Sequence, residues 1–134
     1  MALFQRPPPL VVRDQHLPRQ VPIEAYGDFG FRFEGMTHSG SLLCLPSGIH
    51  GWQVEQPAEI DSEALASILD QASAIDVLII GTGRDIAPFP PALRAALREA
   101  GIGLEVMGTV PAIRTYNILL AEGRPVAAAL IAIT

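Results

Sequence analysis

The stretch "VLIIGTGRD" at residues 77–85 decides the fold of this 134-residue chain. It begins with β-forming apolar residues and turns over at two glycines, a threonine and an arginine. The apolar run "IDVLII" at 75–80 is continuous, which is typical of a parallel strand covered on both faces. The stretch therefore predicts a central strand of an α/β domain, followed by a glycine-rich loop at the strand's carboxyl end.

Helical and strand patterns alternate on both sides of this central strand. Before it, Asp61 suits a helix N-cap, and apolar residues recur at helical spacing from 65 to 72. After it, Pro90 and Pro91 open a second helix, which Gly101 can end. A third helix is predicted over 110–122, with Thr109 as its cap. Strands are predicted at 102–107 and 126–133, so the whole pattern indicates an α/β domain with a largely parallel sheet.

The N-terminal half has a different pattern. Phe29, Phe31 and Phe33 alternate with polar or small residues, which predicts a half-buried strand, and "YGDFG" at 26–30 indicates a bend between two short strands. "SLLCLP" at 41–46 and "IHGWQV" at 49–54 are further candidate strands. We expect these to form an antiparallel β addition, giving a mixed sheet with helices on its faces.

Residues 1–20 contain four prolines, Pro7, Pro8, Pro9 and Pro18. Proline removes backbone donors, so we expect a proline-rich flexible arm that contributes little to stability, followed by a single domain over 21–134.

The composition excludes several kinds of site and partner. All nine basic residues are arginines, so no Schiff-base lysine and no lysine-containing phosphate loop can form. The net charge of −5 argues against nucleic-acid binding. The longest apolar run, 126–133, is too short for membrane insertion. A single cysteine, Cys44, allows no internal disulfide and fits a reducing compartment, so we expect a cytoplasmic location.

Three linked segments in the second half resemble one known family. "IIGTGRD" at 79–85, "GIGLEVMGTVPAIRTYNILLAEGR" at 101–124 and "VAAALI" at 126–131 are similar to the adipogenesis-associated Mth-type domain family. That family is a domain of unknown function, and its mitochondrial relatives include the third NADH dehydrogenase (complex I) assembly factor. The resemblance spans roughly residues 23–132 and implies a three-layer α/β fold with no established enzymatic activity. By analogy with the mitochondrial branch, it implies a role in assembling respiratory complexes.

The glycine-rich loop allows two interpretations. A dinucleotide-binding fingerprint is excluded, because its third glycine is replaced by Ile86 and prolines delay the following helix. In the first interpretation, Gly81, Thr82, Gly83 and Arg84 share a rim with Thr109 and Arg114, and the two arginines hold an anion. In the second, the glycines only permit tight turns, Arg84 pairs with Asp85 or another surface acid, and Thr109 is a cap.

Asn117 is a further candidate ligand-binding residue beside those of the 81–84 and 109–114 loops. It falls on the apolar stripe of the third predicted helix, close to Arg114, where a buried amide must find partners. Either it belongs to the rim site, or it binds the backbone of a neighbouring loop. We favour the structural role.

No catalytic or metal-binding constellation is evident. Cys44 lies in an apolar strand, where a thiol is usually inert, although His38 and His50 lie six residues away on either side. The histidines have no metal-ligand spacing, and we expect neither a metal nor a cofactor. Glu105 is expected at a sheet edge or paired with arginine, and Trp52 in the core.

Two functional hypotheses follow. The leading one is a non-catalytic protein-binding or assembly-factor module, whose partners by resemblance are respiratory-complex subunits. The alternative is a small-molecule or anion-binding protein, or an enzyme, that uses the rim of the 81–84 and 109–114 loops.

Overall fold

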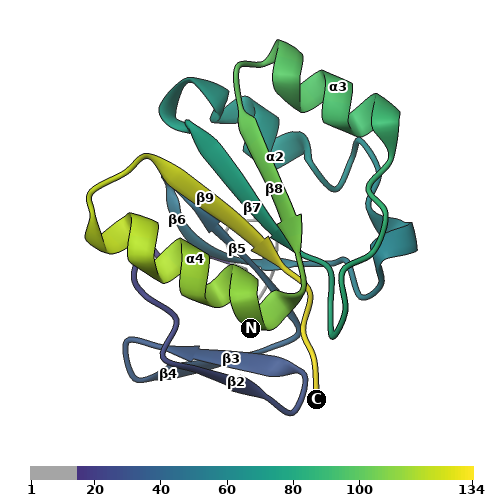
Figure 1. The fold of residues 1–134 in the computed structure, drawn as a ribbon. Coiled ribbons are helices and arrows are strands. Elements are labelled where there is room, and N and C mark those ends of the chain that lie inside the picture. The colour runs from purple at the N-terminus through teal and green to yellow at the C-terminus, as the bar shows by residue number, and fades with distance from the viewer. Residues whose placement is uncertain (1–14) are drawn as a thin grey trace, which may run out of the picture.

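The computed structural model describes residues 15–134, which form three layers (Figure 1). The middle layer is a six-stranded sheet of order β1–β6–β5–β9–β7–β8, with bounds Gln15–Leu17, Gly48–Trp52, Ser41–Leu45, Val126–Leu130, Val77–Gly81 and Gly103–Met107. A separate sheet contains β2 (Ala25–Gly27), β3 (Gly30–Phe33) and β4 (Met36–Ser39). The helices are α2 (Ala66–Asp70), α3 (Pro91–Glu99) and α4 (Thr109–Ala121), with 3-10 turns η1 (Pro57–Glu59) and η2 (Ala72–Ala74).

The six-stranded sheet is mixed, as predicted. β9, β7 and β8 run parallel to one another, whereas β5 pairs antiparallel with β9, β6 with β5, and β1 with β6. The N-terminal strands β2, β3 and β4 form an antiparallel addition. The α/β class with an N-terminal antiparallel β addition is therefore confirmed.

Each face of the six-stranded sheet has its own apolar core. Side chains that alternate along β7 show the division: Leu78 and Ile80 pack with α2 and α3, whereas Ile79 packs with α4. Phe31 and Phe33 of β3 join the α4 side. The small sheet and α4 consequently cover one face, and α2 and α3 the other (Figure 1).

Several predicted boundaries are corrected by the structure. The helix expected from Asp61 to residue 72 is only five residues long, α2, because the residues before it form tighter turns in which the Leu65 N–H donates to the Ser62 carbonyl (3.3 Å). The predicted capping by Asp61 is confirmed, since its carboxylate accepts from the Ala64 N–H (2.9 Å). β9 ends at Leu130 instead of residue 133. Phe29 lies outside the predicted strand: it occupies the turn between β2 and β3 with a φ of 57°.

The predicted N-terminal arm falls partly outside the described residues, since 1–14 are not described. Its described part, 15–20, contacts the domain. β1 pairs with β6, and the Gln20 amide donates to the carbonyls of Val126 (2.7 Å) and Cys44 (3.3 Å). Residues 15–20 thus add a strand to the sheet edge beside β6.

Over residues 15–134, no helix combines the length and the apolar content needed to cross a bilayer.

Candidate functional site

The loop after β7 is closed by its own threonine. The Thr82 hydroxyl donates to the carbonyl of Asp85 (2.8 Å) or Met107 (3.1 Å) and accepts from the Ala87 N–H (3.1 Å). The Thr82 N–H donates to the Met107 carbonyl (2.8 Å) at the end of β8. Thr82 therefore ties the ends of two parallel strands together and fixes the start of the 82–90 connection.

Thr109 has a different role from the predicted helix cap. It is the first residue of α4, Gly108 occupies the cap position, and the Thr109 side chain is fully buried. Its hydroxyl accepts from the Gly83 N–H (3.0 Å) and donates to the Ile131 carbonyl (2.7 Å). One hydroxyl thus joins the loop after β7, the start of α4 and the end of β9.

Glycine is needed at the two loop positions, 81 and 83, for different structural reasons. A side chain at Gly81 would meet the Thr109 Cα at 2.9 Å, so glycine permits the close approach of α4 to β7. Gly83 has a φ of +108°, a conformation that other residues rarely adopt. The Thr82 and Gly83 N–H groups are already bonded within the protein, so neither is directed at a ligand phosphate. Two backbone amides at the start of the loop are therefore occupied by bonds within the protein.

Of the two arginines of the predicted rim, only Arg84 lines a cavity beside the loop after β7. Arg84 donates to the hydroxyl of Thr134 (2.6 Å) rather than pairing with Asp85. It lines a cavity of about 270 Å³ together with Thr82 and Gly83. Thr109 and Arg114 are not among the residues that line this cavity. Arg114 is exposed on α4, and its side chain forms no hydrogen bond or ion pair with the rest of the described chain.

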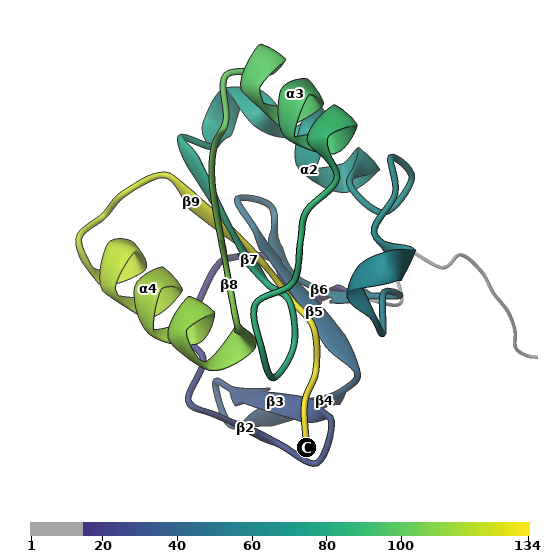
Figure 2. The same ribbon diagram turned by 45° about the vertical axis from the view of Figure 1, so that its right-hand side comes forward.

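The C-terminal segment 131–134 connects the loop to the β2–β3 hairpin. The Phe29 N–H donates to the Ile133 carbonyl (2.8 Å), while Arg84 holds Thr134. Figure 2 shows this segment running between the green 82–90 connection and the small sheet. The hairpin tip, the loop and the segment 131–134 therefore gather at one end of the molecule, beyond the carboxyl ends of β7 and β9, where open α/β sheets commonly bind ligands.

Phe29 is the unusual residue of this region. Asp28 and Phe29, the two central residues of the turn, have φ values of 53° and 57°, as in a type I′ turn. Such turns favour asparagine or aspartate followed by glycine, and an aromatic residue there costs roughly 1–2 kcal/mol. The side chain is nevertheless 56% exposed, so the strain brings no burial. The backbone is held by the Ile133 carbonyl and by the Gly40 N–H, which donates to the Phe29 carbonyl (2.7 Å).

Two neighbouring hollows flank Phe29. One is the cavity of about 270 Å³ that contains Arg84, and the other, of about 580 Å³, is lined also by Ser39 to Ser41. They adjoin, because both are lined by Phe29, Glu55, Gln56 and Ala132. We call the two together the hairpin-tip cleft. It combines an exposed aromatic ring with one carboxylate and one guanidinium, a composition suited to holding a peptide segment.

Asn117 does not belong to the cleft. Its side-chain oxygen accepts from the Ile23 N–H and its amide donates to the Ile23 carbonyl, both at 2.9 Å. The predicted bonding to a neighbouring loop is confirmed, although the side chain is half-buried rather than buried.

Cys44 is a core residue whose thiol is protected from reaction by burial. The thiol is fully buried, and burial raises its pKa to about 12 against the weaker, opposing effect of a hydrogen bond with Tyr116. His38 bonds instead to His16 (2.7 Å) and to the Ser41 carbonyl (3.0 Å), and His50 to the Ser47 hydroxyl (2.9 Å). No cluster of three metal-ligating side chains exists within residues 15–134.

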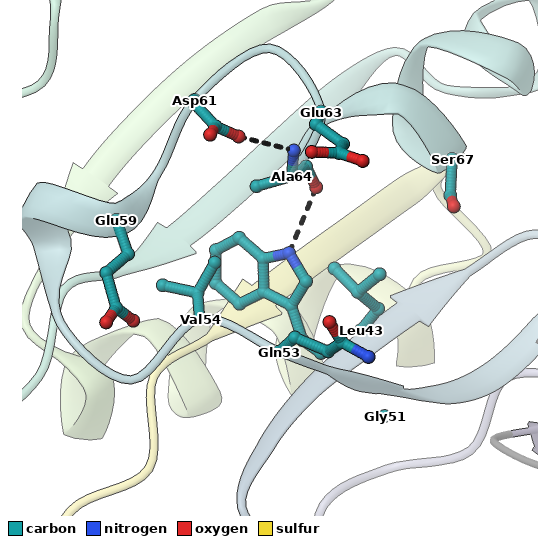
Figure 3. Close-up of a pocket in the computed structure, with 10 residues that line it drawn as sticks. Leu43, Gly51, Gln53, Val54, Glu59, Asp61, Glu63, Ala64 and Ser67 are labelled. Carbon is teal, nitrogen blue, oxygen red and sulfur yellow. Dashed lines mark hydrogen bonds between the residues drawn. The ribbon is translucent and has the colours of Figure 1, made fainter. Parts of the chain in front are cut away.

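A further cavity, of about 410 Å³, lies over Trp52 and is shown in Figure 3. The carboxylates of Glu59, Asp61 and Glu63 surround it, but the first two close local turns: Glu59 accepts from the Glu55 N–H (2.7 Å) and Asp61 from the Ala64 N–H (2.9 Å). Trp52 is only 8% exposed and donates to the Ala64 carbonyl (3.0 Å), which confirms its predicted core position.

Sequence reasoning missed Phe29, Glu55, Gln56 and the segment 131–134 as parts of one site. The sequence pattern placed Phe29 in one alternating strand with Phe31 and Phe33. In the structure Phe31 and Phe33 are buried, whereas Phe29 is exposed. The available signal was the pair Asp28–Phe29 between two glycines, which is the spacing of a two-residue hairpin turn.

Comparisons with known proteins identify relatives along nearly the whole domain. A family model described as "Protein of unknown function (DUF498/DUF598)" matches residues 23–131. An uncharacterized protein of Rhodobacter capsulatus is 38% identical over 111 residues, which cover 83% of this chain and 84% of the relative. The mouse NADH dehydrogenase [ubiquinone] 1 alpha subcomplex assembly factor 3 is 32% identical over 114 residues, covering 85% of this chain and 62% of the mouse protein.

Solved structures share the fold. The NMR structure of a Rhodopseudomonas palustris protein has 54% sequence identity and a TM-score of 0.79, with 87% of each chain covered. A Bordetella pertussis protein described as a Mth938-like domain has 30% identity and a TM-score of 0.69, covering 98% of this chain and 92% of that one.

Proposed function

This chain belongs to the DUF498/DUF598 family, and we propose that it is a non-catalytic protein-binding module that assists the assembly of a respiratory NADH dehydrogenase. The mouse relative named as such an assembly factor supports the role, although this chain spans only 62% of that protein. The proposal includes a cytoplasmic site of action and a protein partner, and it involves no nucleic acid.

The observation that carries the proposal is the strained, exposed Phe29 at the hairpin-tip cleft. Backbone strain that brings no internal burial is found where function requires a particular side chain. Aromatic side chains, phenylalanine included, are enriched in the buried core of protein interfaces. The cleft accommodates a segment of a partner that places an apolar side chain against Phe29.

Site-specific photo-crosslinking in cells that naturally make this chain tests the proposal. A benzoyl-phenylalanine at position 29 should form adducts with subunits of the NADH dehydrogenase. The matched control places the same group at Ile118, which is equally exposed (58%) but lies on α4. Identical adducts from both positions, or none from position 29, would contradict the proposal. Deleting the gene should also reduce the assembled dehydrogenase on native gels.

A second candidate function is binding of a small anion at the cleft, through the guanidinium of Arg84. It is supported by the guanidinium of Arg84, whose only bonded partner in the described chain is the neutral hydroxyl of Thr134. Inorganic phosphate should then bind weakly and in a salt-sensitive manner, and Arg84→Ala should abolish binding. Arg114→Ala serves as the control, because Arg114 does not line the cavity. Saturable binding of NAD or ATP would contradict the interpretation of the loop as a rigid turn.

A further inference from the structure

The outer edge of β8 carries unpaired backbone groups. β8 lies at one end of the six-stranded sheet, and β7 is its only strand neighbour within the described chain. The Gly103 N–H donates to the Asp76 carbonyl and the Met107 carbonyl accepts from the Thr82 N–H, both at 2.8 Å and both on the β7 side. Backbone groups alternate sides along a strand, so the N–H and C=O groups of Leu104 and Val106 point away from the sheet.

The two edges of the six-stranded sheet differ in how well they are protected against the addition of another strand. At the opposite edge, the register of β1 with β6 shifts between Gln15 and Leu17. Irregular edges discourage strand addition. β8 has five residues and contains neither a proline nor a bulge. Leu104 and Val106 are half-buried against the core shared with α3, so an added strand would extend that apolar layer.

The charge of Glu105 determines which side chain an added strand can place opposite it. It is exposed, it projects to the opposite side of the sheet from Leu104 and Val106, and it forms no ion pair in the described chain. In an antiparallel addition centred on β8, it occupies a non-hydrogen-bonded pair, in which the facing side chains are closest. A positive charge at the facing position stabilises the pair, and a negative charge opposes it.

A second copy of this chain fits poorly. In an antiparallel pair of two β8 strands, the outward N–H and C=O groups of Leu104 and Val106 are all bonded only when Leu104 of each strand faces Val106 of the other. That register places Glu105 of one copy directly opposite Glu105 of the other. Shifted registers require Ile102 or Gly108 as partners. The Ile102 N–H is already bonded to Leu97, and the Gly108 carbonyl accepts from Ala112 in the first turn of α4.

We propose that the β8 edge receives an extended segment of another protein as an antiparallel strand, with a lysine or arginine opposite Glu105 between two apolar residues. This inference is independent of Phe29 and of the hairpin-tip cleft, so the two surfaces can be tested separately.

The test uses the ¹⁵N-labelled full chain and two acetylated, amidated peptides, Thr-Thr-Val-Lys-Val-Thr-Thr and its counterpart with glutamate in the centre. The lysine peptide should shift the amide signals of Leu104 and Val106 and bind roughly threefold to fivefold more tightly than the glutamate peptide. Glu105→Lys should reverse that preference. Val106→Pro should abolish binding of both peptides, because it removes an outward N–H that β7 does not use.

Several outcomes would overturn the proposal. These are absence of shifts at Leu104 and Val106 at millimolar peptide, equal binding of the two peptides to both the parent chain and Glu105→Lys, or unchanged binding to a folded Val106→Pro. Dimerisation of the parent chain in the absence of peptide, measured by sedimentation and abolished by Val106→Pro, would replace the proposal with self-pairing. If Val106→Pro does not fold, the reversal by Glu105→Lys still decides the matter, because that substitution lies on an exposed position.

Discussion

The side-chain amide of Asn117 forms a pair of hydrogen bonds with the backbone of Ile23, accepting from its N–H and donating to its carbonyl, both at 2.9 Å. The two residues lie 94 positions apart in sequence. Asn117 therefore fastens the segment before the β2–β3 hairpin to α4, in the same way that a neighbouring strand would.

Replacing Asn117 by leucine should destabilise the protein by about 1–3 kcal/mol, because both backbone groups of Ile23 lose their partner. Urea unfolding followed by circular dichroism measures the change. Ile118→Ala is the control, since it alters an exposed position on the same helix. A neutral Asn117→Leu would show that water replaces the amide at no cost.

Thr109→Val should be at least as damaging. The substitution preserves side-chain shape but removes the hydroxyl that joins the Gly83 N–H to the Ile131 carbonyl. Two polar groups are then unsatisfied at a fully buried position, and we expect a loss of about 2 kcal/mol or more. Thr109→Ser retains the hydroxyl and should lose much less. Equal stability of the two variants would contradict the bridging role.

The segment 15–20 should stabilise the domain, contrary to the expectation that the whole segment 1–20 contributes little. Gln20 is the sharpest test, because its amide spans the carbonyls of Val126 and Cys44. Gln20→Ala should cost about 1 kcal/mol, the usual contribution of such bonds. Thermal unfolding compared with Gln15→Ala, whose amide reaches only an exposed carbonyl, separates this effect from a general effect of the segment. A thermal midpoint unchanged by Gln20→Ala would favour the original expectation.

Alkaline pH should unfold the protein through Cys44 and Tyr116. Burial raises the pKa of both groups, that of Cys44 from 9.0 to about 12. Above pH 9 the unfolded chain releases the thiol proton while the folded chain keeps it. The contribution of the Cys44 thiol is therefore fully present below pH 9 and is lost as the pH rises toward 12, by about 1.4 kcal/mol per pH unit. The raised pKa of Tyr116 acts in the same direction, beginning above pH 10.

The measurement is the urea midpoint from pH 7 to pH 11, compared between the parent chain and Cys44→Ala. The variant should be less stable at neutral pH but should lose stability less steeply above pH 9. Parallel curves would mean that the thiol titrates normally. In the same protein, a thiol reagent at pH 8 should react only after unfolding, because thiolate is the reactive form.

The sequence predicted well those elements that local pattern specifies. β7, α3 and β8 lie where the continuous apolar run, the paired prolines and the "IGLEVM" segment place them. Glu105 lies on a strand at the sheet edge, as expected for a charged residue in an apolar strand. Such features depend on neighbours a few residues apart in sequence, which the sequence displays directly.

Long-range contacts were the part that sequence could not supply. The pattern around Thr109 is that of a helix cap, and only the arrival of Ile131 makes its hydroxyl a bridge. Phe29 continues an alternation that the turn interrupts, because the segment 131–134 and Gly40 hold its backbone. The loop contact between Gly83 and Thr109 is likewise long-range, and of the two predicted arginines only Arg84 lines the cleft.

Phe29 provides the last prediction, in which stability and function should change in opposite directions. Phe29→Gly places the preferred aspartate–glycine pair in the type I′ turn and relieves the cost of a side chain at a φ of 57°. The gain is reduced by the greater freedom of glycine in the unfolded chain, which costs roughly 0.5–1 kcal/mol. Little packing is lost, because the ring is largely exposed. The net effect should be a stabilisation of up to about 1 kcal/mol in urea unfolding.

Phe29→Ala is the informative control, since alanine keeps the strained backbone and removes the ring, and it should not stabilise. Both variants should lose co-purification of the dehydrogenase subunits found by crosslinking at position 29. A stable Phe29→Gly that retains its partner would show that the ring is not the anchor, and a destabilised one would show that the ring packs against the cleft.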